Sequence, residues 1–195
     1  MTTPMAQESR QRYTFADYLT WNGPVRFELA AGEAVLLASP AAGHQLVLAE
    51  ILHQLMDFLE GKPCKAVPAP FDVRLFEREG DEPEDIDTVV QPDISVVCDR
   101  TKLDDRGCKG APDMVIEILS PSSHRHDRIT KYDLYQRAGV KEYWIVEPEA
   151  RTVQVFLRGD KGILLPHESY GDKDAARVHV LDGCIIEMCK VFPEA

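Results

Sequence analysis

The chain has 195 residues, of which 44% are hydrophobic, and this length and composition suit one compact domain, residues 1–195, with a sizeable core. Its net charge of −11 excludes a surface that is basic throughout and binds nucleic acid everywhere. No apolar run approaches the roughly 20 residues that cross a bilayer, so we expect a soluble protein with no membrane partner.

The first predicted elements are a short helix over residues 14–19 and a β-hairpin that follows it. The hairpin joins strands at 25–29 and 34–37 through a turn that contains Gly32. Glu28 lies in the first of these strands. Alternation along a strand permits a solvent-facing side chain there, and this interpretation is favoured over a functional one.

A long helix is predicted over residues 42–59, with apolar residues on one stripe and Gly61 closing it. His44 shares that stripe. A lone histidine on an apolar face is more often a core residue with its hydrogen bonds satisfied than a ligand. Its position alone therefore favours a structural role over a role in a functional site. The sequence then predicts a strand over 65–76 and a solvated loop over 77–87, where seven of eleven residues are acidic.

Two nearly continuous apolar runs, residues 89–98 and 114–119, predict strands that are buried on both faces. Asp93 lies near the start of the first run, and Glu117 lies within the second. Burying an unpartnered charge is costly, so Glu117 should meet a cation, a metal ion or a proton. On adjacent strands the two carboxylates could converge at one edge of the sheet, where a divalent metal would relieve their repulsion.

The helix that follows carries a lysine on its inward face. At about 100° per residue, Lys131 falls on one stripe with Asp127 and Leu134, and the helix is expected to end near Gly139. A lysine is therefore aimed toward the layer that contains the buried Glu117.

The segment from residue 100 to residue 137 is the basic part of an acidic chain. It has eight Lys or Arg and six Asp or Glu, a net charge of +2, which leaves −13 for the remainder of the −11 total. A polyanion would have to approach the protein at this segment. The alternative, that the excess is an ordinary solvated surface, has about equal weight.

The C-terminal third predicts further strands and no second domain. Residues 142–146 and 152–157 predict a hairpin, and the tail from residue 162 onward predicts one or two more short strands. No internal repeat is recognised.

The five cysteines show no CxxC pair, and no secretory leader is recognised, which predicts reduced thiols and a cytoplasmic location. Their spacing also lacks a structural zinc pattern. Cys98, at the end of a buried run, should behave as a small hydrophobe.

The order helix, strand, strand, strand, helix, strand resembles the core of the PD-(D/E)XK nuclease superfamily. Within it, the chain resembles the restriction-endonuclease-like proteins of the Uma-two type, a family long described as a domain of unknown function. The resemblance spans roughly residues 13–181. It depends on six landmarks in order: FELAAGE with Glu28, SPAAGH with His44, QPD with Asp93, APDMVIEILSPSS with Glu117, DxxxK from Asp127 to Lys131, and AGVKEYWIVEP at 138–148.

This resemblance implies an α/β fold of restriction-endonuclease type, in which a mixed central sheet is flanked by helices and preceded by an N-terminal β-hairpin. The superfamily motif would place a lysine two residues after Glu117, where this sequence has Leu119. In the families that the chain resembles, the lysine comes instead from the following helix, and Lys131 stands at that place.

The implied catalytic residues are Asp93, Glu117 and Lys131, with Asp93 and Glu117 as ligands of Mg²⁺ or, in its place, Mn²⁺. Three further side chains are second-rank candidates for an extra ligand or for a group that positions the metal water or the lysine: His44, Glu28 and Asp127. The set predicts a Mg²⁺-dependent endonuclease of nucleic acid, with DNA the favoured substrate. A homodimer would supply the two sites that cutting both strands requires.

Two other classes of function remain open. One is a catalytically inactive nucleic-acid-binding or protein-interaction module, in which Glu117 and Lys131 form only a buried ion pair. The other is serine hydrolase chemistry by Ser120, His124 and Asp127, which the lack of a GxSxG motif in the sequence disfavours.

Overall fold

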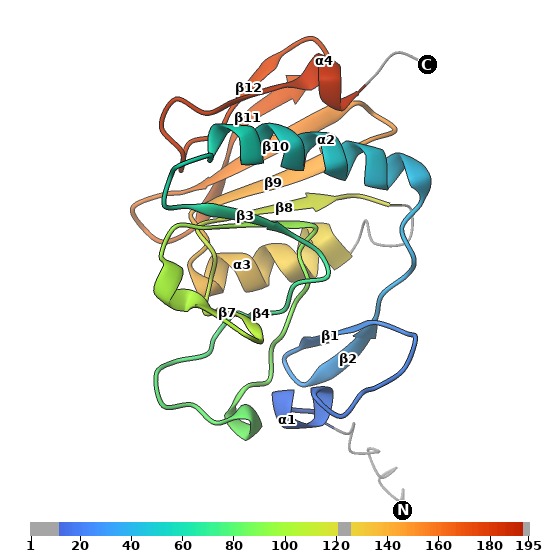
Figure 1. Ribbon diagram of the computed structural model, residues 1–195, viewed down its shortest axis with the longest axis vertical. Helices are drawn as coiled ribbons and strands as arrows, with labels where there is room; N and C mark the ends of the chain where they lie inside the picture. The colour runs from blue at the N-terminus through green and yellow to red at the C-terminus, as the bar shows by residue number, and fades with distance from the viewer. Residues whose placement is uncertain (1–11, 121–125, 193–195) are drawn as a thin grey trace, which may run out of the picture.

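A six-stranded mixed sheet lies at the centre of the protein (Figure 1). The structure is a computed structural model that describes residues 12–120 and 126–192, except for the side chains of residues 126 and 127. The sheet consists of β3 (Lys65–Pro68), β5 (Ile94–Val97), β8 (Met114–Ile118), β9 (Glu142–Glu147), β10 (Thr152–Arg158) and β11 (Leu164–Gly171). Their order is β11-β10-β9-β8-β5-β3; β8 and β9 run parallel, and the other neighbours run antiparallel.

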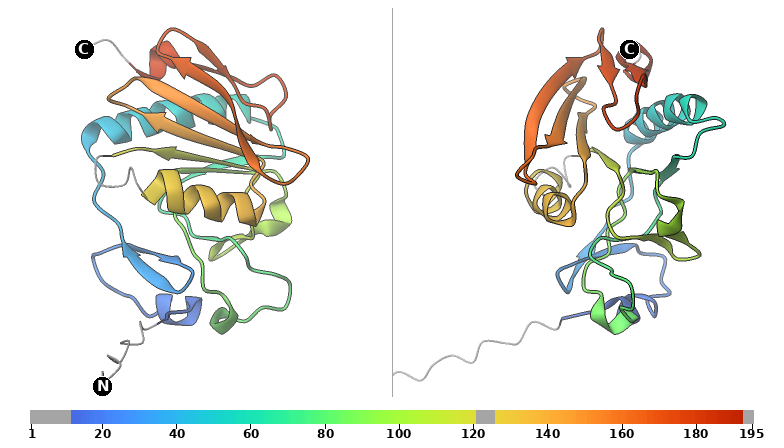
Figure 2. Two further views of the ribbon diagram at one scale, coloured as in Figure 1. Left: turned by 180° about the vertical axis from the view of Figure 1, so that it is seen from behind. Right: turned by 90° about the vertical axis from the view of Figure 1, so that its left-hand side faces the viewer.

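Helices cover both faces of this sheet, as the right-hand view of Figure 2 shows. On one face lies α2 (Ala42–Phe58), whose Ile51 is buried in the same core as Trp144 of β9. On the other face lies α3 (Tyr132–Ala138), which buries Tyr135 in a second core. The predicted arrangement of a mixed central sheet flanked by helices is therefore confirmed.

The N-terminal hairpin lies below the sheet in the view of Figure 1, and its two strands are those that the sequence predicted. They are β1 (Phe27–Ala30) and β2 (Glu33–Leu36), and the short helix α1 (Phe15–Tyr18) precedes them. Two backbone hydrogen bonds of 2.7 Å join Leu29 and Val89. These bonds attach the hairpin to the segment that leads into β5.

The prediction of one strand over residues 65–76 is wrong, because this stretch forms two strands in different sheets. Pro68 and Pro70 have no N–H to donate, so pairing with β5 stops there and the chain turns away. It enters a small sheet made of β4 (Val73–Arg74), β6 (Leu103–Asp104) and β7 (Gly107–Lys109). The loop predicted over residues 77–87 contains the 3₁₀ helix η1 (Pro83–Asp85), and a second 3₁₀ helix, η2 (Arg100–Lys102), follows β5.

The C-terminal part packs on the face that α2 covers. It consists of β12 (Ala175–Arg177), β13 (Ile185–Glu187) and the short helix α4 (Met188–Val191). Ile186 and Val191 belong to the same core as Leu55 of α2, so the tail predicted only as short strands also completes the core. Within residues 12–120 and 126–192, no helix has both the length and the apolar character needed to cross a membrane.

The prediction that all cysteines are reduced is wrong for one pair, because Cys64 and Cys98 form a disulfide. Cys64 precedes β3 and Cys98 follows β5. The antiparallel register pairs Lys65 with Val97, which places the two cysteines at the next opposed positions. Their proximity results from strand pairing rather than from close spacing in the sequence.

Burial raises the pKa of the Cys108 thiol to about 11, so this free cysteine is an unreactive core residue.

Candidate active site

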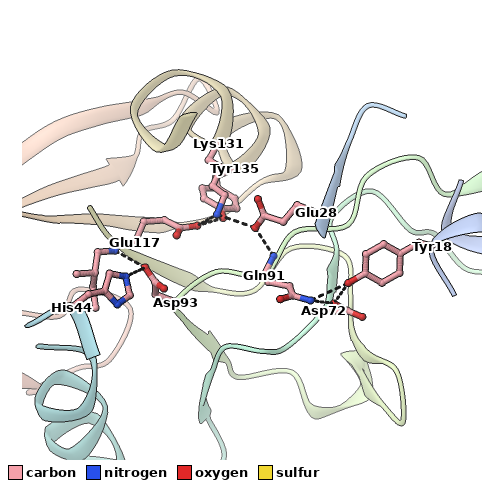
Figure 3. Close-up of polar contacts among 10 residues, drawn as sticks. Tyr18, Glu28, His44, Asp72, Gln91, Asp93, Glu117, Lys131 and Tyr135 are labelled. Atoms are coloured by element: carbon pink, nitrogen blue, oxygen red, sulfur yellow. Dashed lines mark hydrogen bonds and ion pairs between the residues drawn. The ribbon is translucent and has the colours of Figure 1, made fainter. Parts of the chain in front are cut away.

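Glu117 is buried in β8, where the helical segment that follows supplies two donors to its carboxylate (Figure 3). Nζ of Lys131 lies 2.9 Å from Oε1, and the hydroxyl of Tyr135 donates to the same oxygen. Burial, and then the charge of Glu117, raises the pKa of Tyr135 well above its usual value, so the phenol remains a donor. The expectation that this buried carboxylate meets a cation is confirmed.

Lys131 contacts a second buried carboxylate, which comes from the N-terminal hairpin. Its Nζ lies 2.9 Å from Oε1 of Glu28, and that oxygen accepts a 2.7 Å hydrogen bond from the backbone N–H of Gln91. Glu28 is 0% exposed, so the interpretation of this residue as solvent-facing is wrong. The hairpin turns Glu28 inward because the next residue, Leu29, is hydrogen-bonded to Val89 in the segment before β5.

A short π-helix determines how Lys131 reaches this point. It is η3 (His126–Lys131), which continues directly into α3. A π-helix bonds residue i to i+5 and therefore turns less per residue than the α-helix on which the predicted stripe was based. Lys131 is at the junction, and Tyr135 follows one α-helical turn later, so both side chains reach Glu117. The side chain of Asp127, the other polar residue of that stripe, lies outside the described part of the chain.

Asp93 lies immediately before β5, and two elements hold its carboxylate. Oδ2 accepts a 2.7 Å hydrogen bond from the backbone N–H of Ile118 and lies 3.2 Å from Nε2 of His44. His44 is in the first turn of α2, and its side chain is 10% exposed. The structure therefore places His44 in the site, which its position on an apolar stripe only weakly indicated.

The pairing of β5 with β8 brings the two acidic positions together. Ile94 is opposite Ile116 in this antiparallel pair, so Asp93 and Glu117 are the next opposed positions along the two strands. The sequence predicted that these strands are neighbours, and the sheet order confirms it. Asp93 nevertheless faces α2 and Glu117 faces α3, so the two carboxylates have different partners.

His44, Asp93, Glu117 and Lys131 border a cleft of about 220 Å³. Residues 36–40, at the end of β2 and in the segment that leads to α2, supply much of its apolar lining. The polar lining consists of Arg26, Ser39, His44, Gln45, Gln91, Asp93, Glu117, Ser120 and Lys131. A cleft of this kind, with a few convergent polar groups in an otherwise apolar wall, is typical of a site that binds and orients a ligand.

The charges around the cleft fit a divalent cation by their chemistry. The carboxylates of Glu28, Asp93 and Glu117 outnumber the two cations, Lys131 and Arg26, so these five side chains carry a formal charge of −1. Carboxylate oxygens are the ligands that Mg²⁺ and Mn²⁺ prefer. Within the described residues, no three His, Cys, Asp or Glu side chains of the site have ligand atoms within 4.8 Å of one another, so its fit to a metal depends on charge and oxygen chemistry.

Sequence reasoning missed a polar network that supports the site on its hairpin side. The amide Nε2 of Gln91 donates to the hydroxyl of Tyr18 at 2.9 Å and to Oδ1 of Asp72 at 2.8 Å, while the hydroxyl of Tyr18 donates to the same Oδ1 at 2.7 Å (Figure 3). Because the backbone of Gln91 binds Glu28, the network fixes one partner of Lys131. The QPD sequence before β5 was the available signal.

Comparison with known proteins gives matches over most of the chain. A family model described as "Uma2: Putative restriction endonuclease" matches residues 15–188. An uncharacterized protein of Synechocystis sp. (strain ATCC 27184 / PCC 6803 / Kazusa), slr1290, is 22% identical over 149 residues, which are 75% of this chain and 74% of the relative.

A solved structure has a similar fold. It is the crystal structure of a protein from Anabaena variabilis ATCC 29413, described as a putative nuclease belonging to DUF820. The TM-score is 0.71 at 18% sequence identity, and the similarity covers 92% of this chain and 97% of the other. At this identity the likeness is one of fold.

Proposed function

The chain belongs to the Uma2 family of putative restriction endonucleases, and from this membership and the cleft described above we propose that it is a Mg²⁺-dependent endonuclease acting on DNA. Family membership itself supports a nuclease-like function. One observation carries the finer proposal: a buried Lys131 lies between Glu28 and Glu117 at a cleft that Asp93 also lines. Hydrolysis of a phosphodiester requires acidic ligands for a metal ion and a positive charge near the phosphate, at an opening that the substrate can enter. These side chains supply such groups at one cleft.

In this proposal Asp93 and Glu117 are the residues that hold Mg²⁺, with Mn²⁺ as a substitute. When bound, the metal ion polarises the phosphate and favours ionisation of water. Lys131 orients the attacking water and offsets the negative charge that develops on the phosphate. Its two carboxylate contacts hold the ammonium group in a fixed place, so the orientation is set before the substrate arrives.

The second-rank residues have positioning roles around Asp93, Glu117 and Lys131. Glu28 positions Lys131 through its 2.9 Å contact, and His44 positions Asp93 from the opposite side of the cleft. Asp127, whose spacing to Lys131 matches the DxxxK landmark, is proposed as a further group near the metal water. A homodimer would present two such clefts to the two strands of a duplex.

The proposal is tested by comparing metal binding and cleavage in matched variants. Mg²⁺ or Mn²⁺ should raise the melting temperature of the wild type, because an ion that binds the folded state alone stabilises it. Asp93→Asn and Glu117→Gln should abolish both this shift and plasmid or oligonucleotide cleavage. Asp133→Asn is the control, since Asp133 is an exposed carboxylate of α3 that contacts Arg137 one helical turn away. A wild type indifferent to both ions, or Asp93→Asn cutting at the wild-type rate, would contradict the proposal.

One observation favours a second function, a nucleic-acid-binding or protein-interaction module without catalysis. Oε1 of Glu117 already accepts hydrogen bonds from Lys131 and Tyr135, and a buried ion pair with a purely structural role would have the same arrangement. The same experiments separate the two functions. A catalytically inactive module would bind DNA or a protein with no metal-dependent shift in melting temperature and no cleavage in any variant.

A further inference from the structure

A β-bulge in the edge strand β11, far from the cleft, brings together a histidine and a glutamate, two residue types that commonly bind metal ions. In the pairing of β10 with β11, Val155 is opposite Glu168 and Phe156 is opposite Pro166, so His167 is the extra residue. A bulge of this kind re-aims side chains that would otherwise alternate between the two faces. Nε2 of His167 lies 4.0 Å from Oε1 of its neighbour Glu168, which shows that the two side chains reach the same side.

A second histidine approaches the same carboxylate from the C-terminal layer. His179 follows β12, which lies beside β11 at the top of Figure 1, and its Nε2 is 3.7 Å from Oε2 of Glu168. The two imidazole rings are edge to face, with centroids 4.6 Å apart. Among the described residues, Nε2 of His179 is shielded from water and accepts or donates no hydrogen bond.

The three groups are close to the spacing that one metal ion requires. One ligand atom from each of His167, Glu168 and His179 can be chosen so that all lie within 4.8 Å of one another. Two atoms about 2.1 Å from a tetrahedral Zn²⁺ lie about 3.4 Å apart, so side chain movements of about 1 Å would close the site. This is the one such group in residues 12–120 and 126–192 that holds three His, Cys, Asp or Glu side chains at this spacing.

Neighbouring contacts hold the ligands in place. The hydroxyl of Tyr170 donates to Oε2 of Glu168, and it accepts a 3.4 Å hydrogen bond from the backbone N–H of Arg177. The segment that carries His179 is fixed by Glu142, whose Oε2 accepts a 2.8 Å bond from the N–H of Val180. Hydrogen bonds to ligating groups of this kind orient them and strengthen metal binding.

From this geometry we propose that His167, Glu168 and His179 form a binding site for a borderline transition-metal ion, of which Zn²⁺ is the representative. Two imidazoles with one carboxylate favour Zn²⁺, Ni²⁺ or Co²⁺ over Mg²⁺, whereas the cleft offers carboxylates. Across the sheet, Glu168 of β11 is opposite Val155 of β10. Val155 is opposite Trp144 of β9, which is in turn opposite Ile116 of β8. The site is thus three strands from β8, about 14 Å across the sheet, and is separate from the cleft.

The bound ion would add a link between two parts of the chain. His167 and Glu168 belong to the edge of the central sheet, whereas His179 belongs to the layer of β12 and β13. An ion shared between them stabilises the folded chain, because the ligands are dispersed when the chain unfolds. The half-exposed His167 and Glu168 leave access for the ion and for a water molecule as a further ligand.

The test is a calorimetric titration of the protein with Zn²⁺. The buffer contains Mg²⁺, which fills the cleft. All proteins carry Cys189→Ser, because an exposed thiol would bind Zn²⁺ itself. The parent should bind one Zn²⁺ per chain. His167→Gln and His179→Gln should each weaken the affinity by more than about tenfold, and Tyr170→Phe should weaken it less. His53→Gln is the matched control, since His53 also lies near a carboxylate, 3.6 Å from Asp57, but without a third ligand.

A second measurement separates loss of the site from loss of the fold. In EDTA the variants should melt at the temperature of the parent, and Zn²⁺ should raise the melting temperature of the parent and of His53→Gln but not of His179→Gln. The proposal is overturned if the parent binds no Zn²⁺, or if the double variant of His167 and His179 binds it as tightly as the parent. It is also overturned if Asp93→Asn with Glu117→Gln removes the binding, because the ion would then occupy the cleft.

Discussion

Lys131 lies between two buried carboxylates, with its Nζ 2.9 Å from Oε1 of Glu28 and 2.9 Å from Oε1 of Glu117. Replacing it with methionine keeps a stem of similar length but leaves two acidic groups without their cation. We expect Lys131→Met to lower the free energy of unfolding by about 3–5 kcal/mol in EDTA, as loss of one partner from a buried pair does. Chemical denaturation measures this change.

The double variant Lys131→Met with Glu117→Gln shows how much of that loss is charge imbalance. Stability should partly return, because one uncompensated carboxylate has been neutralised, whereas cleavage should not return under the proposed function. Lys190→Met, which removes an exposed lysine near Glu187, should change stability little. A Lys131→Met protein that is as stable as the wild type in EDTA and cuts at the wild-type rate would contradict both roles of the lysine.

Glu142 predicts a pH dependence of stability. Its side chain is buried, with Oε1 accepting from the indole of Trp144 and Oε2 from the N–H of Val180, and burial raises its pKa from 4.5 to about 7. Below pH 4.5 the carboxyl is protonated in both states. As pH rises from 4.5 to about 7, the unfolded chain releases its proton first, so the folded state loses up to about 3 kcal/mol of stability that low pH provided.

Glu142→Gln isolates this effect, since the amide cannot ionise. The free energy of unfolding of the variant, minus that of the wild type, should increase from pH 4.5 to about 7 and then level off. Urea denaturation at several pH values measures this difference. A difference that is constant over the range, or that decreases, would show that burial does not raise the pKa of Glu142.

At the scale of single elements, two glycines have positive φ for different reasons. Gly139 ends α3 with φ +98°, and an added Cβ would meet no atom within 4 Å. Gly107 begins β7 with φ +119°, and its Cβ would lie 2.0 Å from the carbonyl oxygen of Asp72. Gly139→Ala should therefore cost about 1–2 kcal/mol, the usual penalty of the left-handed conformation.

Gly107→Ala should cost more than twice as much as Gly139→Ala, because the backbone of β4 must also move. The N–H of Cys108 donates to that same carbonyl of Asp72, so the small sheet would be disturbed together with the network of Asp72, Tyr18 and Gln91. Thermal denaturation of the two variants gives the comparison. Equal losses would mean that the approach of β7 to Asp72 is loose.

For the whole molecule, the distribution of charge limits how nucleic acid binds. The chain carries −11, and at least four cations of the segment over 100–137 already contact carboxylates: Lys109 with Glu77, Arg128 with Glu147, Lys131 with Glu117, and Arg137 with Asp133. This segment is therefore a weaker polyanion site than its composition indicated.

We expect DNA binding in EDTA to be weak and to weaken further between about 50 and 200 mM salt, because few phosphate contacts are available. Fluorescence anisotropy with a labelled duplex measures it. Arg26→Ala, at the cleft, should reduce binding, whereas Lys190→Ala, on α4, should not. Tight binding at high salt in EDTA would point instead to recognition that does not depend on phosphate charge.

The sequence by itself determined the elements whose signal is local. The apolar runs located β5 and β8, the 3.6-residue period located α2, and a lysine on the inward stripe indicated Lys131, because periodicity and burial are properties of neighbouring residues. The same reasoning predicted that Glu117 needs a cation. The family resemblance added the order of the landmarks, and the mixed sheet flanked by helices agrees with it.

Only the tertiary structure decided which faces and which distant residues meet. Alternation allowed Glu28 either face, and attachment of the hairpin to Val89 buried it against Lys131. Strand register, not cysteine spacing, joined Cys64 to Cys98, and a bulge directed His167 toward the carboxylate that His179 also approaches. These outcomes depend on contacts between segments far apart in the chain, which a local pattern of residue types does not encode.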